Sequence, residues 1–199
     1  MESTGSASRR DGGSPWRDSR PSRGPSRASS ASSVSNGAAR PPRWLAPVIV
    51  IGVVVLDQLT KVWVIAQLSD APLPIVGDDV ELRLTGNSGG AFGLFTNATI
   101  VLAVLAIVLS VVLARAVRRA RDRWSVVALS LVLGGALGNL LDRLFRAPGF
   151  LRGEVVDYVR VGSFPSFNVA DSAITIGAIL LIVIALRTPA DGTPTEPAR

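Results

Sequence analysis

The stretch WLAPVIVIGVVVLDQLTKVWVI, residues 44–65, decides the fold of this chain. A helix needs about 20 predominantly apolar residues to cross a bilayer, and this stretch is close to that length. Three similar apolar runs follow at residues 98–117, 124–144 and 170–186. Buried helices of a soluble domain are a weak alternative, because four such runs would leave almost no amphipathic surface. The sequence therefore predicts an all-α membrane protein with four transmembrane helices.

Two tails flank this helical part, which we take as one domain at residues 44–187. Residues 1–43 are rich in Ser, Gly, Pro and Arg and nearly devoid of large apolar side chains. Such a segment buries too little surface to offset its ordering entropy, so we expect disorder there and at residues 188–199. We do not expect the first tail to be a cleavable signal peptide, because the apolar run behind it is long and begins late.

The arginines indicate the orientation in the membrane. Eight Arg precede the first apolar run, five crowd the link between the second and third runs, and Arg187 follows the fourth. By the positive-inside rule, both termini and that link are cytoplasmic. Membrane topology explains the basic residues better than nucleic-acid binding does, so no nucleic-acid partner is expected.

The two segments on the opposite, outer side contain strand-like patterns. Residues 80–85 alternate apolar and polar side chains, and residues 155–161 are rich in β-branched and aromatic ones. We therefore expect a small β-sheet on the outer, periplasmic or extracellular, membrane face.

Two absences narrow the chemistry. The chain contains neither Cys nor His. Thiol nucleophiles, thiolate metal sites and the commonest general base are thus excluded, which leaves Asp, Glu, Lys or Tyr for acid–base work. No metal and no cofactor is expected.

Ionisable residues in apolar runs need a reason, because each costs about 2.5–3.5 kcal/mol on insertion scales. Asp57 and Lys61 are four residues apart, so they share one helix face and form either a structural ion pair or part of a site. The other polar candidates fall at the same depth, near the outer interface. They are Asn87, Asp142, Arg143, Asp157, Asn168 and Asp171. Gly134, Gly135 and Gly138 would let another helix or a substrate helix approach closely.

Three functions from different classes compete at this point. A transporter would place its charges near mid-membrane and show inverted repeats, and we find no repeat. A Ser–Lys hydrolase would use Lys61 with Ser88 or Ser172. A non-catalytic membrane adaptor would leave the polar clustering unexplained.

Five short motifs favour a fourth reading. They are DQLTK (57–61), NSGGAFGLF (87–95), GALGNLLDR (135–143), VVDY (155–158) and FNVADS (167–172). In this order, across about residues 44–187, they resemble the motifs of the lipoprotein signal peptidase, or signal peptidase II, family. Gly90 stands where that family usually has Ala, and the long Arg/Ser tail is a further departure.

The resemblance implies an aspartic endopeptidase that removes signal peptides from diacylglyceryl-modified bacterial prolipoproteins, cutting before the lipidated cysteine. It implies Asp157 and Asp171 as the catalytic pair, metal-free catalysis and inhibition by the cyclic peptide globomycin. Two carboxylates that share a proton can hydrolyse a peptide, although the sequence leaves open which of them is protonated. Asn87, Gly135, Asn139, Arg143 and Asn168 are candidates for substrate binding or support.

We expect the Asp57–Lys61 pair to be structural. Membrane lipids are expected partners besides the prolipoprotein, with the diacylglyceryl chains lying in the bilayer between helices.

Overall fold

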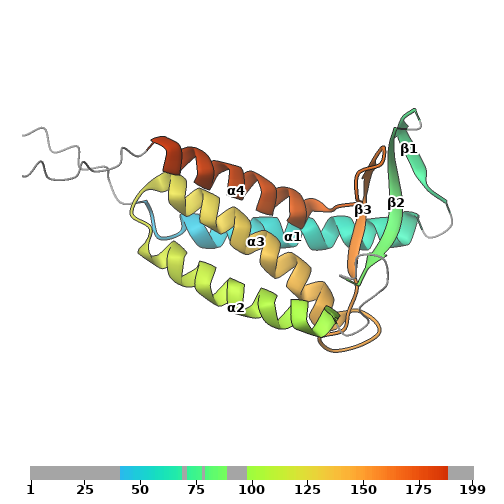
Figure 1. Ribbon diagram of the computed structural model, residues 1–199, viewed down its shortest axis with the longest axis horizontal. Coiled ribbons are helices and arrows are strands. Elements are labelled where there is room, and N and C mark those ends of the chain that lie inside the picture. Colours follow the sequence, from blue (N-terminus) through green and yellow to red (C-terminus); the bar gives the residue numbers. More distant parts are fainter. Residues whose placement is uncertain (1–40, 69–70, 78, 89–97, 188–199) are drawn as a thin grey trace, which may run out of the picture. The chain divides into compact units, whose positions relative to one another are not determined.

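The computed structural model describes residues 41–68, 71–77, 79–88 and 98–187. Within them the chain forms four helices and three strands (Figure 1). The helices are α1 (Leu45–Gln67), α2 (Ala98–Arg119), α3 (Arg123–Phe145) and α4 (Val169–Arg187). The strands are β1 (Leu73–Val76), β2 (Val80–Asn87) and β3 (Val155–Val161). The tails expected to be disordered, 1–43 and 188–199, lie outside the described residues apart from residues 41–43.

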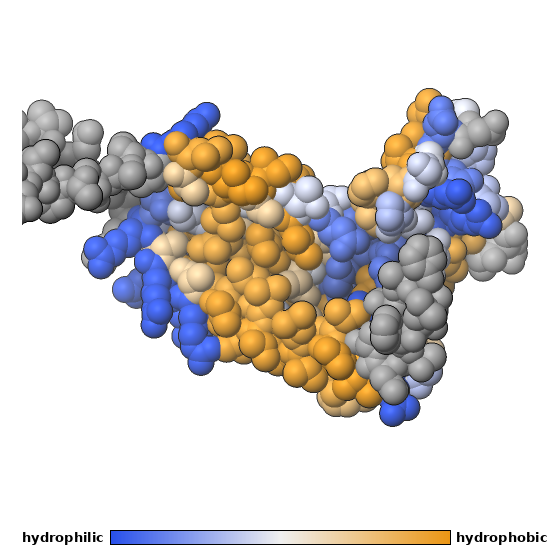
Figure 2. Space-filling model, viewed as in Figure 1, coloured by the Kyte–Doolittle hydropathy of each residue, from blue (hydrophilic) through white to orange (hydrophobic). Residues whose placement is uncertain are grey.

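The prediction of four helices is confirmed, and each predicted boundary lies within two residues of the observed one. All four described helices are long and apolar enough to cross a membrane. In α3, half of the most apolar stretch is buried, against 17% in each of the others. The reason is that α3 is the central helix and packs against α1, α2 and α4. The other helices turn apolar side chains outward, and Figure 2 shows this apolar surface between hydrophilic ends.

Glycines permit the close packing around α3. A Cβ at Gly135 would collide with the carbonyl oxygen of Ala170 in α4, and a Cβ at Gly138 would lie 2.7 Å from Asp57 Oδ2 in α1. Small residues at such contacts allow helix backbones to approach. The close approach of these helices brings the polar residues of α1, α3 and α4 within hydrogen-bonding distance of one another.

The three strands form one antiparallel sheet, in the order β1-β2-β3, at one end of the helices (Figure 1). The two predicted strands are confirmed as β2 and β3, whereas β1 was not predicted. It is a four-residue edge strand that contains Pro74 and exposes all its side chains, so it has no alternating pattern to detect.

Apolar contacts hold β3 on the end of α1. Val64 of that helix and Leu68, which follows its last residue, pack with Val156 and Tyr158 of the strand. The Tyr158 hydroxyl also donates to Thr60 Oγ1 at 2.9 Å. Asp157, which lies between these two strand residues, is thereby fixed at the junction of the sheet and the helices.

Candidate active site

Asp157 and Asp171, from β3 and the first turn of α4, line one groove of about 570 Å³. Apolar side chains form much of its wall, including Phe164, Phe167 and Ile176. The Asp157 side chain is nearly buried, and Asp171 is partly exposed. The two carboxylates that the sequence singled out therefore share one partly apolar site.

The start of α4 positions Asp171. Asn168 Oδ1 accepts a hydrogen bond from the backbone N–H of Asp171 at 2.9 Å, and Asp171 Oδ2 accepts one from the backbone N–H of Asn168 at 3.2 Å. This reciprocal arrangement is that of a capping box. It places the Asp171 carboxylate in the first turn, where the helix dipole favours negative charge.

Two asparagines hold Asp157. Asn168 Nδ2 donates to Oδ1 at 2.7 Å, and Asn87 Nδ2, at the end of β2, donates to Oδ2 at 2.9 Å. Burial raises the pKa of the Asp157 carboxyl to about 6. The negative charge of Asp171 also raises this pKa, while the hydrogen bonds from Asn87 and Asn168 lower it. The group is therefore poised to exchange a proton near neutral pH.

Asn139 of α3 links Asp171 to Lys61. Its Oδ1 accepts from Lys61 Nζ at 3.0 Å and from Asn168 Nδ2 at 3.1 Å. Because an ammonium group only donates, this contact fixes which end of the Asn139 amide is oxygen. The Asn139 Nδ2 must then face the other way, where it donates to Asp171 Oδ1 at 2.8 Å.

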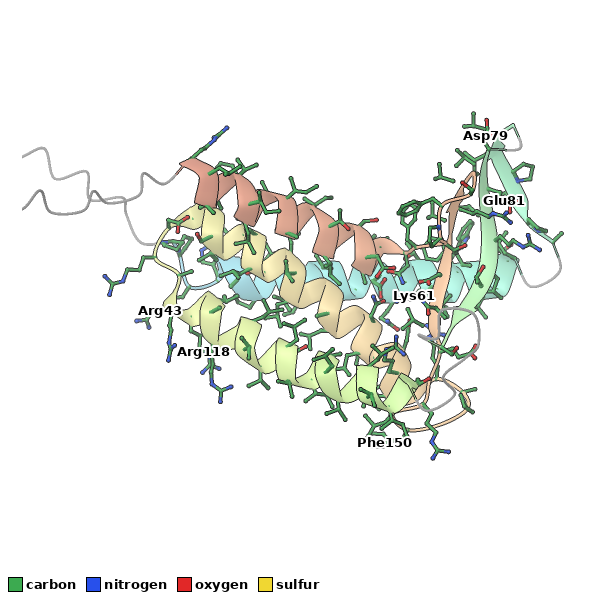
Figure 3. The ribbon with its side chains drawn as sticks, in the orientation of Figure 1. Arg43, Lys61, Asp79, Glu81, Arg118 and Phe150 are labelled. Carbon is green, nitrogen blue, oxygen red and sulfur yellow. The ribbon has the colours of Figure 1, made fainter. Side chains whose placement is uncertain are left out.

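Lys61 joins two carboxylates rather than one. Its Nζ lies 2.8 Å from Asp57 Oδ2 and 2.7 Å from Asp142 Oδ2, and all three side chains are fully buried. Together with Asn139, these contacts use the three N–H donors of the ammonium group. Figure 3 places Lys61 at the end of the helices nearest the sheet.

The Ser–Lys alternative has no geometric support. In the described part of the chain, Lys61 Nζ contacts two carboxylates and an amide oxygen but no serine hydroxyl. The Ser172 hydroxyl instead donates to the backbone oxygen of Asn168 at 2.9 Å.

Arg143 supplies positive charge beside the acids. It is 9% exposed, and its charge interacts with those of Asp157, Asp142 and Asp171. Within the described residues, its buried Nη1 has no hydrogen-bond partner.

The sequence did not single out Gln58 or Arg146. Gln58 Nε2 lies 3.2 Å from both Asp57 Oδ2 and Asp142 Oδ1, and Arg146 Nε lies 2.6 Å from Asp142 Oδ1. The available signal was spacing, because Arg146 follows Asp142 by one helical turn. Of the five supporting candidates, only Asn87 is among the groove residues. Gly135 lies at the contact of α3 with α4.

Some residues of the sequence motifs lie outside the described part of the chain. Residues 89–95 of the second motif lie outside the described part of the chain. Among the described residues, no group of three or more acidic side chains is placed to hold a metal ion.

A buried and a partly exposed carboxylate, both held by donors of Asn168, line one groove of a bundle whose helices can cross a membrane. This is the arrangement of a membrane-bound aspartic hydrolase. The family model described as signal peptidase (SPase) II matches residues 49–187. The chain is 48% identical over 140 residues to a lipoprotein signal peptidase of Rhodococcus jostii, covering 69% of this chain and 71% of that protein. It is 46% identical over 150 residues to one from Mycobacterium avium, covering 74% and 82%.

Solved structures agree with these matches. A structure described as a bacterial membrane enzyme superposes with a TM-score of 0.65 at 29% identity, covering 80% of this chain and 98% of that one. A second, also described as a bacterial membrane enzyme, gives 0.65 at 30% identity, covering 76% and 99%. The chain belongs to the signal peptidase II family and is therefore a multi-pass membrane aspartic peptidase.

Proposed function

We propose that this chain removes signal peptides from diacylglyceryl-modified prolipoproteins, with Asp157 and Asp171 as its catalytic pair. The observation that carries the proposal is their meeting in one groove where asparagines hold both carboxylates. The relatives named above are lipoprotein signal peptidases. We propose that the cut falls before the lipidated cysteine.

Hydrolysis by such a pair needs one ionised and one protonated carboxyl. The ionised group takes a proton from water as the water oxygen bonds to the scissile carbonyl carbon, and the protonated group donates to the carbonyl oxygen. The product of this addition is a tetrahedral intermediate. When it collapses, the C–N bond breaks and the leaving nitrogen takes up the proton that the first carboxylate removed from water. The second carboxylate recovers its proton from the hydroxyl group that becomes the new carboxyl. The raised pKa of Asp157 suits it to carry the shared proton, although the pair titrates as a unit.

Neighbouring side chains orient this pair and its substrate. Asn87, Asn139 and Asn168 fix the carboxylates through the hydrogen bonds described above. The charge of Arg143 moderates the negative charge of the pair. Gly135 supports the site indirectly, by letting α3 approach α4.

The groove also suits a lipidated peptide. Its apolar wall, with Phe164 and Ile176, adjoins the outward-facing apolar surface of α4, so lipid chains would remain in the bilayer while the scissile bond reaches the carboxylates. Globomycin is proposed to inhibit by occupying this groove.

We place both termini and the link between α2 and α3 in the cytoplasm. The support is the run of Arg at residues 115–123, with Arg187 and the arginines before α1. The sheet and the catalytic pair would then lie near the outer face of the membrane.

The test is a gel-shift assay with purified protein and a diacylglyceryl-modified prolipoprotein, with and without globomycin. Asp157→Asn and Asp171→Asn should each abolish cleavage while the protein still inserts and folds. Asp79→Asn, which changes an exposed aspartate of the sheet end, is the matched control and should cleave normally. If either the Asp157→Asn or the Asp171→Asn protein shows appreciable turnover, the substituted aspartate is not catalytic.

A further inference from the structure

A second groove lies at the other end of the helices, away from the sheet. It has a volume of about 590 Å³ and runs between α1, α2 and α3. Its walls are mainly apolar and include Val50, Ile51, Val126 and Leu133. From Val126 to Leu133 the groove follows α3 for two turns, about 10 Å along the membrane normal if the helix is upright.

The mouth of this groove is basic. Arg43 and Arg118 line it, and Figure 3 shows both at the end of the helices away from Lys61. The same two arginines also line an adjoining hollow of about 580 Å³, together with Arg119 and Arg121. Four arginines therefore line the two cavities together, and two of them, Arg43 and Arg118, line both. We call these four arginines the rim.

Within the described residues, no acidic side chain neutralises the rim. All four arginines are exposed, and none of them forms an ion pair with another described residue. The acid next in sequence, Asp122, lines neither cavity; its Oδ1 accepts the backbone N–H of Ser125 at 2.7 Å and caps α3. Arg43 and Arg118 thus offer donors, unpaired among the described residues, at the mouth of the apolar groove.

We propose that this groove binds an anionic phospholipid, with one acyl chain between α1 and α2 and the phosphate on Arg43 and Arg118. Guanidinium groups bind phosphate oxygens in a bidentate manner. Basic pockets between transmembrane helices bind anionic lipid headgroups for the same reason. A zwitterionic lipid would bring its own cation toward the four arginines, so the site discriminates by charge.

The tail of this chain is a poorer occupant. Residues 1–40 contain seven Arg and three acidic residues, so the tail would add positive charge to a rim that is already positive. An anionic lipid instead matches both the apolar channel and the charge of its mouth.

The experiment is thermal unfolding of the full-length protein in zwitterionic micelles. Titration with phosphatidylglycerol should raise the unfolding midpoint in a saturable manner, by about 5 °C at a hundredfold excess over Kd. Phosphatidylcholine at the same mole fraction should give no such rise. Soluble glycerol phosphate should also give none, because it lacks the chain that fills the groove.

Two double variants separate a site from diffuse surface charge. Arg43→Gln with Arg118→Gln should abolish the response to phosphatidylglycerol. Arg123→Gln with Arg187→Gln removes two charges from the same end without touching the groove, and should keep the response. Should the first pair fail to fold, Ala114→Phe, which narrows the groove and keeps every arginine, should lose the response instead.

Three results would overturn the proposal. They are an equal response to phosphatidylcholine, an equal loss in both double variants, and a lower lipid-free midpoint once residues 2–40 are deleted. The last would mean that the tail occupies the groove. Cleavage is not the readout, so failure here is distinct from failure of the proposed function.

Discussion

Asp157 shows how three neighbours set the behaviour of a single carboxyl group. Burial and Asp171 raise its pKa, and the amides of Asn87 and Asn168 lower it. Because this pKa is higher in the fold than in the unfolded chain, the folded state binds the proton more tightly. The resulting stabilisation is complete below about pH 4 and is lost as the pH rises through about 6.

Removing the Asn87 amide should raise the pKa of Asp157. In Asn87→Ala the carboxylate loses a hydrogen bond that favours its ionised form, so the pKa of Asp157 should rise above 6. Infrared difference spectra of the carboxyl stretch, with Asp157→Asn as the blank, would follow it directly. A wild-type midpoint below pH 4.5, or an unchanged midpoint in Asn87→Ala, would contradict this account.

The sequence predicted which residues lie together at the candidate site but not the orientation of their side chains. Asp157, Asp171, Asn139 and Asn168 followed from the motifs and their common depth. The orientation of the Asn139 amide did not, because it depends on Lys61 of another helix, 3.0 Å away. Pattern along one chain gives the faces of helices, whereas hydrogen bonding between helices depends on their separation and rotation.

At the scale of elements, a buried charge cluster ties α1, α3 and α4 together. Lys61 binds Asp57 and Asp142, and Asp57 Oδ1 also accepts the backbone N–H of Ala170 at 3.0 Å. The sequence predicted the pair within α1. It missed the bond to α3, since spacing along one helix cannot identify a partner on another.

Lys61→Ala should therefore damage stability severely. It leaves Asp57 and Asp142 close together in a buried site, and breaking a buried ion pair costs about 3–5 kcal/mol. Adding Asp57→Asn should recover part of the loss, because Asp57 is left without a cation, whereas Asp142 keeps its ion pair with Arg146. Thermal unfolding and specific activity would be measured on the same samples. A Lys61→Ala protein that is stable yet inactive would instead indicate a direct catalytic role.

Gly138 allows a test of helix packing. Its added Cβ would lie 2.7 Å from Asp57 Oδ2, so Gly138→Ala should destabilise the protein by about 1–3 kcal/mol. Gly52→Ala is the matched control, because a Cβ there meets nothing within 4 Å and alanine favours helix by about 1 kcal/mol. Equal unfolding midpoints for the two variants would argue against close packing at Gly138.

At the scale of the whole molecule, length and hydropathy were enough to predict the helices. The apolar surface that reveals a membrane helix is also the surface that faces lipid, so the signal is strong in α1, α2 and α4. β1 was not predicted because all four of its residues are exposed, so its sequence carries no alternation of buried and exposed side chains.

Chelation tests the proposed chemistry of the intact enzyme. Cleavage of the lipidated substrate should persist in EDTA, because the proposed mechanism needs the carboxylates for proton transfer rather than for holding a metal. Loss of activity in EDTA that a divalent ion restores would overturn that mechanism.

The orientation can be tested with the chain's own composition. It has no Cys, so any introduced cysteine is the only thiol and needs no background removed. Arg83→Cys in the sheet and Arg121→Cys between α2 and α3 both change exposed arginines at opposite ends of the helices. In intact cells a membrane-impermeant maleimide should label the first and not the second, and permeabilised cells should label both. The reverse pattern in cleavage-competent protein would place Asp157 and Asp171 on the cytoplasmic side and would show that the arginine count misassigns this topology.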